Sequence, residues 1–381
     1  NTTLNAYGIY ANNLDNITVK NCNVTMSGSG RGTNLIVNNS LILNNTANSN
    51  TYGIYVKGFS NQVINNTANS NAYGIWIQTN NNNYLSGNTA NLNGYGILLL
   101  SGTHNNTVIN NTANSCTTTG IYLGTSNNNT ITNNSLNSNK DGIYLTSSLG
   151  NILTNNNIWN CSTTSEGCIY LSSSHINTIS MGLINLSASN LIYLTGSKNN
   201  TFSDLTLLNS NVSNNDTFLT STSTNNTFLN VSYNQSKEYV QSGSRLVRKW
   251  YYQAYVNDTA GLGVSNANVS AYSSVGTTDF VTQTNSSGWT NITAITEYSK
   301  NGTLRTYYSN YTITASNASY SGIGSKSYNV SAVLGFNNFN DVITIDSITP
   351  TLNISSPVNG SYYNTSTPLF NMSSSEQGTG T

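Results

Sequence analysis

The carboxylates are the first side chains to consider for chemistry. Hydrolysis of a glycosidic bond needs two carboxyl groups facing each other across the sugar, and a lyase needs clustered carboxylates for Ca²⁺ with a basic proton acceptor. The first 240 residues contain Asp15, Asp141, Glu166, Asp204, Asp216 and Glu238. These six form no repeated pair, and Asp141 with Lys140 and Glu166 comes nearest to a charged cluster. We interpret them as solvated loop residues and expect no catalytic site.

Side chains that could bind a soft metal ion are equally dispersed. They are Met26, Met181, Met372, His104, His175, Cys22, Cys116, Cys161 and Cys168. Neither a Cys-x-x-Cys motif nor paired histidines occur, so zinc and copper sites are not expected. Cys161 and Cys168 flank a short insertion, which predicts a disulfide between them and free, buried thiols at Cys22 and Cys116. We predict no cofactor, and the sequence leaves a structural Ca²⁺ open.

Aromatic residues recur at regular intervals along the chain. The main row is Tyr55, Trp76, Leu98, Tyr122, Tyr144, Tyr170 and Tyr193, with a companion row of Tyr52, Tyr73 and Tyr95. An inward-pointing aliphatic residue, usually Ile, precedes each member of the main row, so alternation along a strand directs the rings outward. Three interpretations stay open: stacking of like residues, contact with another subunit or domain, and glycan binding. A long exposed aromatic stripe favours a partner.

These positions recur because the chain itself repeats. From about residue 44 to residue 230 one phrase returns every 21 to 26 residues, a period typical of solenoids. Each copy holds two short runs of β-branched and aromatic residues bounded by Asn, Ser and Gly, which indicates strands and turns. Stacked coils of short parallel strands are therefore predicted over residues 1–240.

Two columns of asparagine support this register. The first is Asn45, Asn66, Asn88, Asn111, Asn134 and Asn156, and the second is Asn48, Asn69, Asn91, Asn114 and Asn137. At a strand spacing of about 4.8 Å, stacked amides can hydrogen-bond from coil to coil. The alternative is that Asn is simply a favoured turn residue.

The pattern Tyr-Gly-Ile-Tyr followed by Asn-x-x-Ile-x-Asn-Asn-Thr resembles the parallel β-helix repeat of the pectin-lyase-like superfamily. More narrowly, it is similar to the Asn-rich versions in surface proteins of methanogenic archaea and in the copper-maturation protein of nitrous oxide reductase. This resemblance implies a right-handed parallel β-helix. It also implies polysaccharide cleavage or copper handling, for which the required side chains are dispersed in this sequence.

Composition indicates an exported chain. Charged residues make up only 6% and the net charge is zero, which argues against nucleic-acid binding. No apolar run is long enough to span a membrane. From residue 246 onward an excess of Asn-x-Ser/Thr sequons predicts N-glycosylation. The candidate acceptors are Asn257, Asn268, Asn285, Asn291, Asn301, Asn310, Asn317, Asn329, Asn353, Asn359, Asn364 and Asn371.

The repeat stops near residue 240. Alternating runs separated by turns predict an antiparallel immunoglobulin-like β-sandwich over residues 246–346. Within it, residues 256–272 resemble the carboxypeptidase-regulatory-like modules of microbial surface proteins. Residues 347–381 are typical of a C-terminal strand segment or the start of a further immunoglobulin-like module, which a neighbouring subunit could complete by strand addition.

The sequence thus favours a non-enzymatic, N-glycosylated structural protein of a microbial, archaeal-type cell surface. We expect it to assemble with copies of itself into a sheath, surface layer or filament, since its first coil starts without a polar cap. The expected partners are those copies and covalent glycans, with no nucleic acid and no membrane span. The alternatives are a surface adhesin or glycan-binding protein that uses the aromatic row, and a polysaccharide lyase or hydrolase.

Overall fold

The chain forms two compact units, which are described separately. The computed structural model describes residues 6–26, 30–79, 81–162, 166–211, 213–320, 322–332, 339–346, 351–356 and 371–375. The first unit comprises Asn1–Arg248 and Ser299–Thr306, and the second comprises Lys249–Tyr298 and Tyr307–Thr381. The described residues form β-strands and two short 3-10 helices, η1 (Gln235–Lys237) and η2 (Val330–Ala332). None of the described helices is long and apolar enough to cross a membrane.

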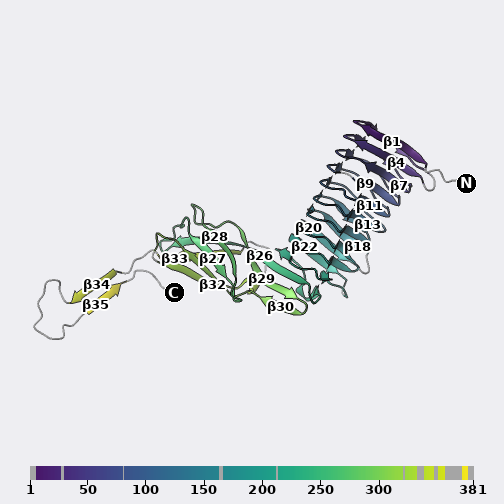
Figure 1. Cartoon of the computed structure of the whole chain (residues 1–381). Helices are drawn as coiled ribbons and strands as arrows, with labels where there is room; N and C mark the ends of the chain where they lie inside the picture. The colour runs from purple at the N-terminus through teal and green to yellow at the C-terminus, as the bar shows by residue number, and fades with distance from the viewer. Residues whose placement is uncertain are drawn as a thin grey trace, which may run out of the picture. The chain divides into compact units, whose positions relative to one another are not determined.

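The first unit is a parallel β-solenoid, as the repeat predicts (Figure 1). One side of every coil contributes a strand to an eleven-stranded sheet, here called sheet A. Its strands, in spatial order, are β1 (Tyr7–Asp15), β4 (Arg31–Asn38), β7 (Tyr52–Lys57), β9 (Tyr73–Gln78), β11 (Tyr95–Leu100), β13 (Thr119–Gly124), β16 (Asp141–Thr146), β19 (Gly167–Ser172), β21 (Asn190–Thr195), β23 (Thr217–Thr220) and β25 (Glu238–Val240).

A second side of the coils forms sheet B. Its parallel strands are β2 (Thr18–Lys20), β5 (Leu41–Leu43), β8 (Gln62–Ile64), β10 (Tyr84–Ser86), β12 (Thr107–Ile109), β14 (Thr130–Thr132), β17 (Ile152–Thr154), β20 (Thr178–Ser187), β22 (Thr201–Ser210) and β24 (Asn226–Leu229), followed by β26 (Arg245–Asp258). A third side holds the short pairs β3 (Asn23–Val24) with β6 (Thr46–Ala47), and β15 (Ser135–Asn137) with β18 (Asn157–Cys161).

Like residues stack on like residues because the strands are in register. Ile54 pairs with Ile75, and Ile75 with Ile97, and all three side chains are fully buried. The glycine before each isoleucine is needed for this close approach. A Cβ at Gly74 would come within 2.5 Å of both the Asn93 amide nitrogen and the Gly96 carbonyl oxygen. In these coils the position before the isoleucine therefore accepts only glycine.

Columns of asparagine, here called ladders, hydrogen-bond from coil to coil and satisfy the backbone and side-chain polar groups of the turns. In the first column the backbone N–H of Asn45 donates to Oδ1 of Asn66 at 2.9 Å, and Nδ2 of Asn66 donates back to the Ile42 carbonyl at 2.9 Å. In the second column the direction is reversed, because the N–H of Asn69 donates to Oδ1 of Asn48 at 2.7 Å. Buried amides are tolerated because their donors and acceptors are paired.

A buried carboxylate ties a later segment to the last coil. The side chain of Glu238 in β25 is fully buried and lies 2.8 Å from the Arg305 guanidinium and 3.3 Å from the Lys300 ammonium. These two cations belong to β30 (Leu304–Tyr307) and β29 (Thr293–Asn301). Residues 299–306 therefore belong to the first unit although they lie about sixty positions further along the chain.

The second unit contains the predicted antiparallel strands. They form a four-stranded sheet of β28 (Thr278–Gln283), β27 (Asn268–Tyr272), β31 (Tyr311–Ser316) and β32 (Ile323–Tyr328). β33 (Phe339–Ile345) pairs in parallel with β26, and β34 (Thr351–Ser356) pairs with β35 (Asn371–Ser375) in antiparallel fashion. An antiparallel sheet is thus present, whereas an immunoglobulin-like sandwich is not established, and the β26–β33 pair departs from an all-antiparallel arrangement.

Candidate functional site

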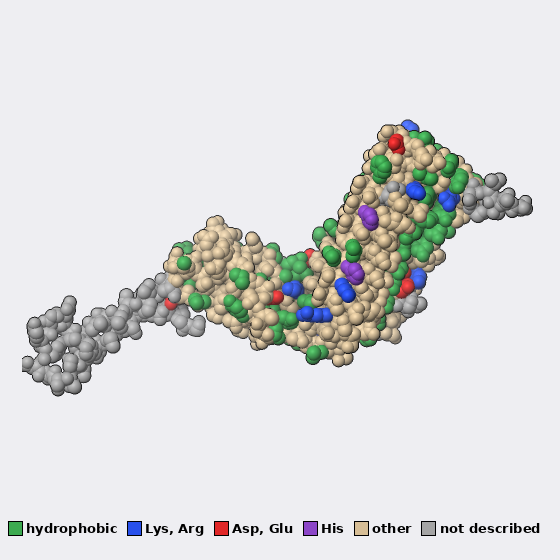
Figure 2. Space-filling view, viewed as in Figure 1, with side chains coloured by type: hydrophobic (Ala, Val, Ile, Leu, Met, Phe, Trp, Pro, Cys, Tyr) green, Lys and Arg blue, Asp and Glu red, His purple; other side chains and the backbone are tan. Residues whose placement is uncertain are grey.

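The outer side of sheet A carries the aromatic rings, and we call this surface the aromatic face. Most of the rings are half-buried, since they pack against each other from coil to coil. The predicted row continues beyond Tyr193 with Phe218 and Tyr239. In Figure 2 a green band of hydrophobic side chains runs along the stack of coils, and charged side chains are few and scattered.

The rings are ordered by the register of the strands. In the companion row Tyr52 stacks on Tyr73 at a centroid distance of 5.1 Å, and Tyr73 stacks on Tyr95 at 5.6 Å. Trp76 of the main row stacks on Tyr52 at 5.3 Å, so the two rows interlock at this end. The ring-on-ring packing is the coil-to-coil stacking that one of the three interpretations expected, and offset stacks of this kind add about 0.5–1.5 kcal/mol per pair.

Three phenols of the face, those of Tyr55, Tyr122 and Tyr170, are held neutral at physiological pH. Burial raises the pKa of Tyr122 and of Tyr170 to about 12. Burial also raises the pKa of Tyr55, against the opposing effect of Arg31. The Arg31 guanidinium lies 4.5 Å from the centroid of the Tyr52 ring. The face therefore offers hydroxyl groups and apolar ring edges, with a fixed cation at one end.

The structure brings two members of the predicted charged cluster together. Lys140 and Glu166 form an ion pair at 2.9 Å, with both side chains partly exposed. The hydrogen bond to Glu166 is the main cause that raises the pKa of Lys140. Asp141 is the first residue of β16 and is buried, so the interpretation of these carboxylates as solvated loop residues does not hold for it.

The remaining solenoid carboxylates hold the structure together. Asp15 accepts from Asn38 at 2.8 Å and Asp204 accepts from Asn230 at 2.7 Å. The other two are buried: Asp216 accepts from the Ser210 hydroxyl, and Glu238 pairs with the cations described above.

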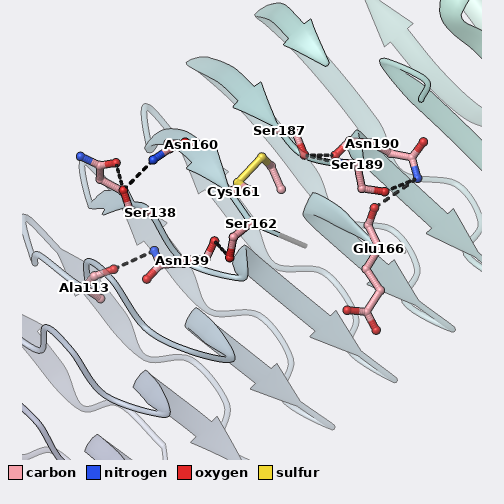
Figure 3. The surroundings of a disulfide bond; sticks show 12 residues. Ala113, Ser138, Asn139, Asn160, Cys161, Ser162, Glu166, Ser187, Ser189 and Asn190 are labelled. Carbon is pink, nitrogen blue, oxygen red and sulfur yellow. Dashed lines mark hydrogen bonds between the residues drawn. A yellow bond between two sulfur atoms is a disulfide. The ribbon is translucent and has the colours of Figure 1, made fainter. Parts of the chain in front are cut away.

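The cysteines are placed as follows. Cys161 and Cys168 form a disulfide with a Cα–Cα distance of 5.5 Å, between β18 and β19 (Figure 3). Cys22 and Cys116 are free; Cys116 is buried, whereas Cys22 is only half-buried. Burial raises the pKa of the Cys116 thiol to about 11, so it is an unreactive thiol rather than a soft metal ligand.

The described residues do not fit a copper site. No group of three or more His, Cys, Asp or Glu side chains among them could hold a metal ion. Nδ1 of His104 accepts from the Asn127 N–H at 2.9 Å, and Nδ1 of His175 accepts from the Lys198 N–H at 3.0 Å. The free lone pair of each histidine therefore accepts a hydrogen bond from a backbone N–H of the next coil. Asn81 and Asn127, at the equivalent positions of other coils, accept in the same way.

The predicted glycan acceptors lie at the surface where their side chains are described. Six of them are exposed and two are half-buried: Asn268, Asn285, Asn291, Asn301, Asn310 and Asn329 in the first group, and Asn257 and Asn317 in the second. Asn353 and Asn371 lie in β34 and β35, and Asn359 and Asn364 lie outside the described residues. None of the eight is buried, so each is accessible to modification.

The structure contains a further asparagine ladder that the sequence analysis does not predict. It is a second buried column, formed by Asn61, Asn83, Asn106, Asn129, Asn151, Asn177, Asn200 and Asn226. Its signal is the Asn that lies two residues before the first buried hydrophobic residue of each sheet B strand from β8 to β24. It fixes the spacing of the coils and hence of the rings.

Comparison with solved structures gives matches of low sequence identity. A double mutant of the periplasmic alginate epimerase AlgG is 17% identical, with a TM-score of 0.44, over 52% of this chain and 55% of the epimerase. A DFA-IIIase from Arthrobacter chlorophenolicus A6 is 14% identical, with a TM-score of 0.37, over 58% and 70% of the two chains. Tailspike protein 2 of Escherichia coli O157:H7 bacteriophage CAB120 is 10% identical, with a TM-score of 0.38, over 79% and 63%.

These neighbours correct the expectation of a non-enzymatic protein. An epimerase and a DFA-IIIase are among the similar structures. At such identities the likeness extends to the fold alone, and this chain spans only about half the length of the epimerase. None of the three is a sheath or surface-layer protein by its description.

A comparison with protein families identifies the solenoid more closely. A search of curated proteins gave no match. Residues 1–117 and 112–263 match the family described as periplasmic copper-binding protein (NosD). These ranges cover the coils and the start of the second unit, and together they exceed half of the chain. The chain therefore belongs to the NosD family.

Proposed function

We propose that this protein binds an extended, uncharged polysaccharide on the aromatic face of sheet A, outside the cytoplasm. The observation that carries the proposal is the continuous surface of Tyr and Trp rings, repeated once per coil on a rigid parallel sheet. Such rings combine apolar area with a hydroxyl or N–H group, which matches the alternation of C–H and O–H groups on a sugar.

Charge supports an uncharged ligand. The strands of the face carry few ionic groups, and Lys140 is paired with Glu166. The raised pKa values of Tyr122 and Tyr170 keep the phenols protonated, so they can both donate and accept hydrogen bonds. The family description, periplasmic, agrees with a ligand met outside the cytoplasm. N-glycans on the exposed sequons and a place at the cell surface belong to the same proposal.

Assembly into a sheath, surface layer or filament is the less favoured proposal. The sequon excess favours it, and none of the structural neighbours reported above adds support to it. The aromatic face, by contrast, is a defined surface with named residues. We therefore place binding first.

The test adds a bulky side chain to the aromatic face without replacing any of the ring residues. Thr146 is half-buried on the outer side of β16, so Thr146→Arg should cover the face and weaken retention on insoluble polysaccharides at least about tenfold. The matched control is Thr132→Arg, at a half-buried position of β14 in sheet B, which should bind as the unmodified protein does. Equal binding by both variants, or no retention of the unmodified protein, would refute the proposal. Sugars released during the same incubation would reveal cleavage.

A further inference from the structure

Three successive rings of the main row, those of Tyr144, Tyr170 and Tyr193, stand on edge. Tyr144 and Tyr170 are stacked at 4.4 Å with an interplanar angle of 21°, and Tyr170 and Tyr193 at 5.0 Å with 11°. Because these residues occupy successive coils, their ring faces point along the axis of the stack and cover one another. A ligand above the face would meet their edges.

Tyr122 is turned away from this stack. Its ring makes an angle of 83° with the ring of Tyr144 and of 69° with that of Tyr95. The residue before it in the row is Leu98, which is buried and has no ring. No ring of the row therefore stacks on Tyr122.

Gly124 makes room for this orientation. A Cβ at Gly124 would lie 2.9 Å from Cε1 and 3.3 Å from the hydroxyl oxygen of Tyr122. The ring thus extends along β13 and passes over Gly124. A plane that contains the strand direction and is nearly perpendicular to the Tyr144 ring must face outward. Tyr122 lies flat on the sheet, with one face on Gly124 and the other toward solvent.

The glycine is particular to this coil. The residues in register with it on the two neighbouring strands are Leu100 and Thr146, and both carry side chains. The Leu100 methyl group Cδ1 lies 2.5 Å from the same Cβ position, so it borders the ring. The rings of Tyr95 and Tyr144 also border Tyr122, with centroids 5.6 Å and 5.1 Å from that of Tyr122.

We propose that the outward face of Tyr122 is a stacking subsite for one pyranose ring whose hydroxyls are all equatorial, such as a unit of a β-linked glucan. Such a sugar carries its axial C–H groups on its two faces, and these positively polarised groups pack on the electron-rich face of an aromatic ring. A sugar with an axial hydroxyl would present a polar group to the ring and bind less well. This inference rests on the proposed function and names its specificity-determining residue.

The experiment compares three variants by calorimetric titration with cellohexaose and laminarihexaose. Tyr122→Ala removes the platform. Gly124→Ala keeps the phenol but lifts its ring from the sheet, and the atoms it meets are flexible side-chain ends. Both should weaken binding at least about tenfold, the equivalent of about 1.4 kcal/mol. Tyr84→Ala removes an exposed ring from β10 in sheet B, away from the aromatic face, and as the matched control it should stay within about threefold.

The outcomes separate the two proposals. If the unmodified protein binds a hexaose and Gly124→Ala binds it equally well, the Tyr122 subsite is refuted while binding on the aromatic face stands. If the unmodified protein binds neither hexaose, the subsite is refuted as well, and the Thr146→Arg comparison on other polysaccharides decides the proposed function. If Tyr122→Ala does not fold, Tyr122→Phe replaces it and should retain binding within about threefold, because the flat ring remains.

Discussion

Replacing a ladder asparagine should destabilise the solenoid far more than replacing its outward neighbour. Asn111 is 1% exposed. Its Oδ1 accepts from the backbone N–H and from Nδ2 of Asn88, both at 2.9 Å. Its Nδ2 donates to the carbonyl oxygen of Leu85 at 3.1 Å and to Oδ1 of Asn134 at 3.1 Å. One side chain therefore links three coils.

The substitution Asn111→Leu keeps the number and branching of the side-chain heavy atoms and removes every one of these bonds. The backbone N–H of Asn88 is then buried without an acceptor, which costs about 1–3 kcal/mol, and each further lost bond costs about 1 kcal/mol. We expect a loss of about 4–6 kcal/mol in the free energy of unfolding, of which the Asn88 N–H accounts for about 1–3 kcal/mol. Because a solenoid opens locally, the hydrogen exchange of the Asn88 amide should accelerate by about two orders of magnitude.

The control is the adjacent residue. Asn110 is exposed and has a φ of 55°, a conformation that glycine adopts without strain. The preceding coil has Gly87 at the equivalent place, with a φ of 65°. Asn110→Gly should therefore change the unfolding free energy by less than about 0.5 kcal/mol. If denaturant unfolding gave Asn111→Leu and Asn110→Gly the same stability, and the Asn88 amide exchanged normally, the ladder would not be a source of stability.

Three further substitutions test other contacts. Glu238→Gln removes the buried charge that faces two cations and should cost about 3 kcal/mol, seen as faster hydrogen exchange in residues 299–306. Burial, and then Lys198, lowers the pKa of His175 from 6.5, so the neutral ring stabilises the fold above pH 6.5 and this contribution is lost as the pH falls below it. His175→Asn should remove that part of the pH dependence of the thermal midpoint and leave the midpoint at pH 8 unchanged. Opening the disulfide with Cys161→Ser and Cys168→Ser together should cost about 2.5 kcal/mol, since the bridge closes a loop with a sequence separation of only 7.

The repeat made the solenoid predictable because its signal is periodic and strong. Buried and exposed asparagines are harder to distinguish from the sequence, because Asn110 and Asn111 are adjacent residues of the same type. Only the left-handed backbone at Asn110 separates them, and nothing in a single sequence reports that angle. For the same reason the second buried ladder was missed, and the reversed direction of the bonds from the Asn48 column was not foreseen.

The boundary between the two units could not be predicted from local sequence patterns, for a different reason. Residues 299–306 return to the first unit because Lys300 and Arg305 pair with Glu238 across more than sixty positions. Ion pairs between single residues that are far apart in the chain produce no periodic pattern in the sequence. Likewise, alternation predicted that the ring of Tyr122 points outward, but its flat orientation depends on the missing side chain of Gly124.

The departures from the repeat are therefore where specificity resides. A regular coil spaces its rings by the ladder bonds of its turns, so the rings are held in place before any ligand arrives, and little side-chain entropy remains to be lost on binding. An unbroken stack of edge-on rings would offer the same contacts at every coil. Leu98 interrupts the row and Gly124 lets the Tyr122 ring lie flat, so this coil differs from the coils that carry Tyr144, Tyr170 and Tyr193. A polymer bound along this face would meet a flat ring at this coil, and its orientation depends on a residue that contributes no side chain.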